Sequence, residues 1–139
     1  MYRFVTTLLA THILADCRQE RRSAEAEACK AGGEVVRRAI ERGEPLLLLE
    51  YPPLPYPPGH GIYTDLLKQR CQVEWEVGQP GDRFVELFIE EVHGWNLIVG
   101  AEIRKRHGKM IMDDLYREAR HIFNQESDKP ETDPGFPRR

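Results

Sequence analysis

A cluster of prolines near the middle of the chain restricts its fold more than any other sequence feature. Five of the seven residues from 52 to 58 are proline. Proline fixes φ and has no backbone N–H, so neither a helix interior nor a central strand can pass through these residues. The pattern predicts a stiff connector between two regular elements. The alternative is a polyproline ligand, because PPLP at 52–55 has the form that aromatic grooves bind.

Short strand-forming segments lie on both sides of this connector. The apolar run LLLLE at 46–50 follows a helix stop at Gly43 and Pro45, which favours a buried strand. QVEWEVG at 72–78 alternates apolar and polar residues and predicts a half-buried strand. The segment 62–70 between them fits a short helix. A strand, a crossover helix and a second strand predict a small βαβ unit with parallel strands.

Two helices are predicted after the second strand. Asp82 is the expected N-cap of the first, whose apolar residues recur every 3.6 residues from Phe84 to Ile103. Basic residues are expected at its end, because they suit the negative end of the helix dipole. Gly108 follows them and can adopt the left-handed conformation that ends a helix. The apolar residues of the second helix run from Met110 to Phe123. We expect the two to form an antiparallel hairpin packed on the sheet.

The N-terminal residues 1–43 predict a helical arm. Apolar residues recur at helical spacing in its first part, and a narrow stripe of mainly small residues follows, made of Ala24, Ala28, Ala31, Val35 and Ala39. Gly32 and Gly33 are expected to break or kink this helix, because paired glycines lower helix stability. A helix with an apolar stripe needs a helix to pack on, so the stripe predicts a homodimer or a protein partner.

Together these elements predict a helix-rich α/β fold in a single domain of residues 1–124. The N-terminal helical arm would occupy 1–43 and the α/β core 46–124. Residues 125–139 are polar, charged and rich in proline, which predicts a disordered tail. A chain of 139 residues with 40% hydrophobic residues is of the size that one core can stabilise.

Charge and cysteine content bear on location and partners. The net charge of −3 provides no basic surface for nucleic acid, and the first apolar run is too short to span a membrane. Three cysteines without a CxxC pair indicate free thiols in the cytoplasm. The alternative is a secreted or lipid-anchored protein, in which residues 1–16 are a processed signal and Cys17 carries the lipid.

One candidate pocket would bring together His60, Tyr63, Trp95 and Asn96. Trp95 and Asn96 lie on or beside the apolar face of the predicted helix, and a buried amide must find hydrogen-bond partners. In the simpler interpretation Asn96 ties its helix to a strand end or to the proline connector. Gly94 and Gly100 would let another backbone approach this helix closely.

A metal site is the second candidate. The motif E-x-x-H occurs twice, as Glu90 with His93 and Glu118 with His121, and di-iron bundles use such pairs on two helices. Metal ligands in a bundle project inward, whereas Glu90 and His121 fall nearly opposite the apolar faces of their helices. We therefore expect neither a metal nor another cofactor.

The function that the sequence favours is a non-enzymatic interaction or accessory protein that associates with itself. The stripe on the N-terminal helix and the thin two-stranded sheet support this interpretation. A small enzyme with a pocket near Asn96 or a di-metal site is the alternative. Phosphate-binding, dinucleotide-binding and nucleophile-elbow motifs are absent from the sequence.

Overall fold

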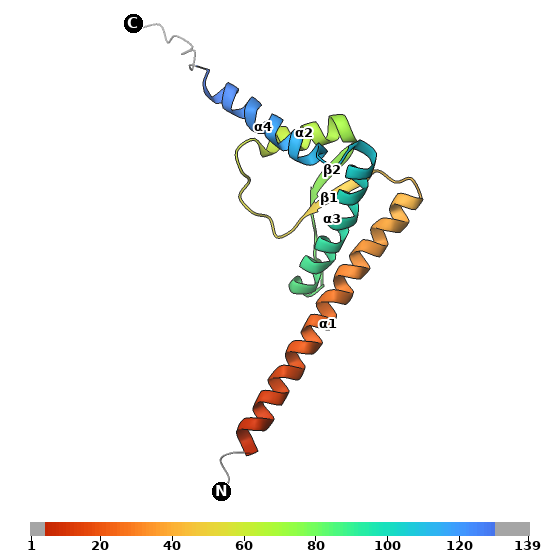
Figure 1. Ribbon diagram of the computed structural model, residues 1–139, viewed down its shortest axis with the longest axis vertical. Coiled ribbons are helices and arrows are strands. Elements are labelled where there is room, and N and C mark those ends of the chain that lie inside the picture. Colours follow the sequence, from red (N-terminus) through yellow and green to blue (C-terminus); the bar gives the residue numbers. More distant parts are fainter. Residues whose placement is uncertain (1–4, 130–139) are drawn as a thin grey trace, which may run out of the picture.

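The computed structural model describes the backbone of residues 5–129 and the side chains of residues 18–129. Within this range the predicted helix-rich α/β fold is confirmed (Figure 1). The elements follow one another as α1 (Val5–Glu41), β1 (Leu46–Glu50), α2 (His60–Cys71), β2 (Val73–Val77), α3 (Val85–His107) and α4 (Ile111–Ser127).

The two strands form the predicted parallel pair, with register from Leu46 opposite Val73 to Glu50 opposite Val77. Leu46 and Val73 are buried to 3% and 1% exposure, because this end of the sheet meets the helices. Burial decreases along β2, and Val77 at its far end is 40% exposed. The strands therefore insert one end into the core and present the other at the surface.

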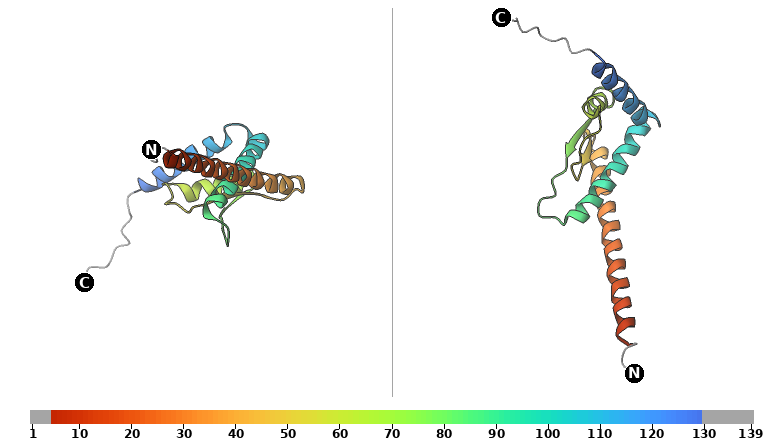
Figure 2. Two further views of the ribbon diagram at one scale, coloured as in Figure 1. Left: turned by 90° about the horizontal axis from the view of Figure 1, so that it is seen from below. Right: turned by 90° about the vertical axis from the view of Figure 1, so that its left-hand side faces the viewer.

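Helix α4 packs mainly on α2, whereas α3 packs mainly on α1 and β1. The expected antiparallel hairpin of α3 and α4 is therefore wrong, and α4 turns away from α3 (Figures 1 and 2). The buried Leu115 and Ala119 of α4 join the same core cluster as Leu67 of α2. Arg70 of α2 donates two hydrogen bonds to the carboxylate of Glu118 on α4, at 2.7 and 2.5 Å.

Helix α1 is one continuous helix of 37 residues. The expected break at Gly32 and Gly33 does not occur, because both glycines are buried against α3 and their lack of a side chain serves that packing. The second half of α1 lies along α3. The first half projects away from the rest of the described chain (Figures 1 and 2).

Two helix ends differ from the sequence prediction. Asp82 does not cap α3, since a turn in which Arg83 N–H donates to Pro80 O precedes the helix, and α3 begins only at Val85. Helix α4 continues to Ser127, into the segment expected to be disordered. Residues 1–4 and 130–139 lie outside the described part of the chain.

The prediction of a processed signal falls largely outside what the structure describes. The backbone of residues 5–17 forms the first turns of α1, but the side chain of Cys17 is not among those described. Over the described residues, none of the helices combines the length and the apolar character that crossing a membrane requires.

Candidate functional site

The free edge of β1 is closed by two side chains of α3. The Asn96 amide accepts a hydrogen bond from Leu49 N–H at 2.9 Å and donates one to Leu49 O at 2.6 Å. Trp95 Nε1–H donates to Leu47 O at 2.7 Å. The amide therefore pairs with β1 as a neighbouring strand would, which satisfies an edge that could otherwise recruit another chain. This is the tie to a strand that the simpler sequence interpretation predicted.

Helices α1 and α3 cross with their backbones almost in contact. A methyl group added at Gly94 would lie 1.8 Å from Cys29 O, and one added at Gly32 would lie 2.0 Å from Glu91 O. The predicted close approach at Gly94 is therefore confirmed. At Gly100 the nearest group is instead the side chain of Arg104, at 3.3 Å, so no second backbone approaches there.

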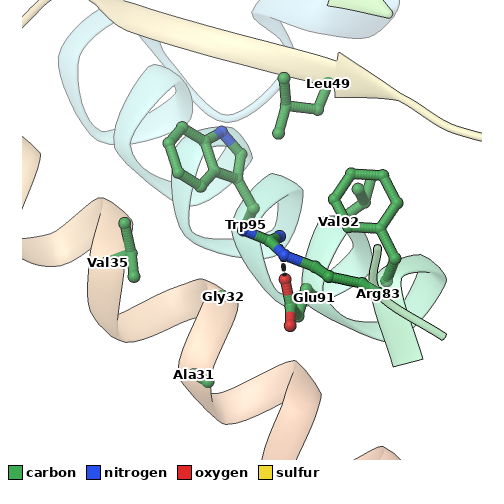
Figure 3. Close-up of a pocket in the computed structure, with 9 residues that line it drawn as sticks. Ala31, Gly32, Val35, Leu49, Arg83, Glu91, Val92 and Trp95 are labelled. Carbon is green, nitrogen blue, oxygen red and sulfur yellow. Dashed lines mark hydrogen bonds and ion pairs between the residues drawn. The ribbon is translucent and has the colours of Figure 1, made fainter. Parts of the chain in front are cut away.

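Beside this crossing, α1, β1 and α3 enclose an apolar cavity of about 330 Å³ (Figure 3). An ion pair between Arg83 and Glu91, at 2.6 Å, crosses one side of it. The Arg83 guanidinium also lies 5.4 Å from the ring centroid of Phe88. The apolar lining consists of Ala31, Val35, Leu49, Phe88, Val92 and Trp95.

A second hollow of about 250 Å³ continues along the same side of α1. It is lined by Arg21, Ala24 and Glu25 of α1, by Phe84 directly before α3, and by Glu86 and Leu87 of α3. Phe84 is 78% exposed, which is unusual for a phenylalanine. The two hollows form what we call the α1–α3 groove, which runs along α1 from Arg21 to Val35.

An aromatic cluster gathers on the other strand, around Trp75 of β2. His60 stacks on Tyr56 with ring centroids 4.1 Å apart and meets the Trp75 ring edge-on at 5.1 Å. Tyr63 also meets Trp75 edge-on, at 6.4 Å. Burial raises the pKa of the Tyr63 hydroxyl. The cluster fixes the end of the proline connector, which carries a cis peptide between Tyr51 and Pro52.

Glu50 is the acidic group of this cluster. Burial alone would raise the pKa of its carboxyl, but hydrogen bonds from Trp75 Nε1–H, the Tyr56 hydroxyl and Leu54 N–H outweigh it. The electrostatic influence of His60 acts in the same direction, so the pKa of Glu50 lies below the usual 4.5. The ionised carboxylate therefore holds the connector against β2.

The lowered pKa of Glu50 predicts an acid-dependent loss of stability. A carboxyl with a lower pKa in the folded state stabilises the fold above its unfolded pKa and loses that contribution as the pH falls through the folded pKa. We expect Glu50→Gln to lower the melting temperature by a few degrees at pH 6 and by nothing once Glu50 is protonated, well below pH 4.5. Thermal unfolding across this range, with Glu76→Gln as a control on an exposed carboxylate, measures the difference. Equal effects of both changes at pH 6 would contradict the role of Glu50.

The four residues of the predicted pocket fall into two groups. His60 and Tyr63 contact Trp75, while Trp95 and Asn96 bond to β1. Trp95 lines the α1–α3 groove, and His60 lines a different, more polar hollow of about 360 Å³. The Asn96 carbonyl and amino groups are both engaged by Leu49, so its side chain has a structural role.

The two E-x-x-H motifs lie on helices that do not run side by side. His93 and His121 are exposed, and the Glu118 carboxylate is engaged by Arg70. Among the side chains of residues 18–129, the structure contains no group of three or more His, Cys, Asp or Glu residues placed to hold a metal ion.

Sequence reasoning missed the α1–α3 groove. The stripe on α1 was visible, but Ala24, Ala31 and Val35 are exposed beside α3, and the face that packs on α3 is centred on Gly32, Gly33 and Val36. The two adjacent glycines were the available signal for that face, because a helix retains paired glycines where a second backbone crosses it.

The groove can bind apolar side chains along a length of helix. Its walls are mostly apolar. Four of its charged side chains form two ion pairs, Arg83 with Glu91 and Arg21 with Glu25, and Glu86 is the fifth charged residue of the lining. Such a surface suits association with another helix better than acid–base chemistry. No protein-family model, curated protein or solved structure matches this chain.

Proposed function

We propose that the protein is a non-enzymatic interaction protein that acts as a homodimer through α1. The observation that carries this proposal is the stripe of Ala24, Ala28, Ala31 and Val35 beside the α1–α3 groove, in which only Ala28 is half-buried and the other three are exposed. Val35 is 55% exposed although its neighbour Val36 is buried. We call these four residues the α1 stripe.

The α1 stripe suits a helical partner. Small side chains let a second helix approach closely, and the adjacent groove offers further apolar area to cover. The first half of α1 stands away from the other described elements (Figure 2). Most of the stability of a helix in a protein comes from packing of its apolar face, so packing against a second copy would stabilise this half.

Sedimentation equilibrium tests the proposal. The wild-type chain is expected to be a dimer at micromolar concentration, and Ala31→Arg is expected to raise the dimer dissociation constant about 100-fold, because it places an unpaired charge in the interface. Since Ala31 is exposed in the single chain, the substitution should leave the circular dichroism spectrum of the monomer unchanged.

Ala26→Arg is the matched control. Ala26 is also exposed on α1 but lies outside the stripe, so the same substitution should leave the dissociation constant unchanged. A wild-type chain that sediments as a monomer would rule out the proposal. Equal weakening by both substitutions would show that the α1 stripe is not the contact.

A further inference from the structure

We infer that two copies of α1 pair antiparallel, so that the first half of each helix lies in the α1–α3 groove of the other copy. This inference rests on the proposed function and specifies its partner and orientation. Spacing, side-chain size, charge order and length along α1 each support it.

The α1 stripe is part of a longer heptad pattern. Its residues follow one another at steps of four, three and four, the spacing of a coiled-coil seam. The same alternation continues back through the sequence at Arg21, Cys17, Leu14 and Ala10. One seam therefore links the groove side of the second half of α1 with the half that projects from the body.

The seam is symmetric about the point between residues 22 and 23. Helix α1 extends from Val5 to Glu41, so its middle residue, 23, lies next to this point. Antiparallel pairing about it brings Leu14 of one copy opposite Ala31 of the other, and a large residue meets a small one. Parallel pairing would instead set leucine against leucine and alanine against alanine, which leaves gaps along the seam.

The charges on α1 change sign at the same point. Residues 18–22 (RQERR) carry three arginines and one glutamate, a net +2, whereas residues 23–27 (SAEAE) carry two glutamates, a net −2. Antiparallel pairing about residues 22 and 23 places each positive segment beside the other copy's negative segment. Parallel pairing would place like charges together, which is unfavourable.

The groove and the projecting half of α1 also match in length. From Arg21 to Val35 the groove follows 15 residues of helix, about 22 Å at 1.5 Å per residue. The 18 residues from Val5 to Arg22 span about 27 Å, enough to cover it. The exposed Phe84, directly before α3, and the half-buried Trp95 of α3 would then pack on the incoming helix.

Cysteine cross-linking of the full chain tests the orientation. In the antiparallel pair, position 17 of one copy faces position 28 of the other, whereas identical positions 17 and 17 are offset by 11 residues, about 16 Å. Three variants are compared. The first is Cys29→Ser, which keeps the thiol at position 17. The second adds Ala28→Cys, and the third adds Cys17→Ser to the second, so that it keeps only the thiol at position 28 on α1. Cys71 is retained in all three because it is only 4% exposed. The probe is a bis-maleimide too short to span 16 Å.

The variant that carries both Cys17 and a thiol at position 28 is expected to give about tenfold more covalent dimer than either of the other two. Cross-linking in Cys29→Ser alone, or in the variant without Cys17, would indicate parallel pairing and overturn the inference. A dimer by sedimentation that cross-links in none of the three would also overturn it, while leaving the proposed self-association intact. A monomer would overturn both.

Discussion

Gly94→Ala is expected to separate α1 from α3 and to lower the melting temperature by about 10 °C or more, which corresponds to roughly 3 kcal/mol of unfolding free energy. The added methyl group would lie 1.8 Å from Cys29 O, and both partners are helix backbone that cannot rotate away. The gain in helix propensity from glycine to alanine, about 1 kcal/mol, is too small to offset this clash. Thermal unfolding at a fixed chain concentration measures the loss.

Gly61→Ala provides the matched control. Gly61 also lies within a helix, α2, but a methyl group there would meet nothing within 4 Å. The same substitution should therefore raise stability by about 0.5 to 1 kcal/mol. Gly32→Ala should resemble Gly94→Ala, since its methyl group would lie 2.0 Å from Glu91 O. If Gly94→Ala were as harmless as Gly61→Ala, the two helices would not cross as closely as described.

The sheet could be predicted from the sequence because local signals agreed there. The proline connector, the uniform run Leu46–Glu50 and the alternating run Val73–Val77 each restrict the backbone without help from the rest of the chain. The first strand has the predicted bounds 46–50, and the second is one residue shorter at each end than the predicted segment 72–78. Parallel pairing followed because the intervening segment is a helix, which returns the chain to the same end of the sheet.

Helix packing could not be predicted in the same way. Periodicity shows which face of a helix is apolar but not which neighbour covers it. From the sequence alone, the apolar face of α4 that carries Leu115 could pack on α3 or on α2. The contact with α2 is reinforced by hydrogen bonds from Arg70 to Glu118, which lies 48 residues later in the chain. Gly32 and Gly33 lower helix propensity locally, but packing against α3 outweighs that cost.

The candidate site was predictable only where local sequence signals define it, and its partners depend on how the helices pack. Asn96 could be recognised as a polar residue on an apolar face, so a buried hydrogen-bond partner was expected. That the partner is Leu49, 47 residues earlier, depends on α3 lying along the free edge of β1. His60 and Tyr63 belong to α2, and they meet Trp75 because α2 leads directly into β2.

Asn96→Ala is expected to lower stability by about 3 kcal/mol and to expose the edge of β1. The substitution removes two hydrogen bonds and leaves Leu49 N–H and C=O unpaired in a partly buried position, at a cost of about 1 to 3 kcal/mol for each group. Asn124→Ala on α4 is the control, because Asn124 is exposed and alanine is the better helix former. The two identical substitutions should therefore change the melting temperature in opposite directions.

Amide hydrogen exchange separates the loss of this particular bond from a general loss of stability. In Asn96→Ala the Leu49 amide should exchange at least about tenfold faster than global destabilisation alone predicts, since its only acceptor is gone. The amide of Gly78, which donates to Glu50 O at 2.8 Å, should follow the global change. If Leu49 and Gly78 changed by the same factor, the Asn96 side chain would not be the group that closes the edge of β1. A selective change at Leu49 would show that one amide of α3 takes the place of a third strand.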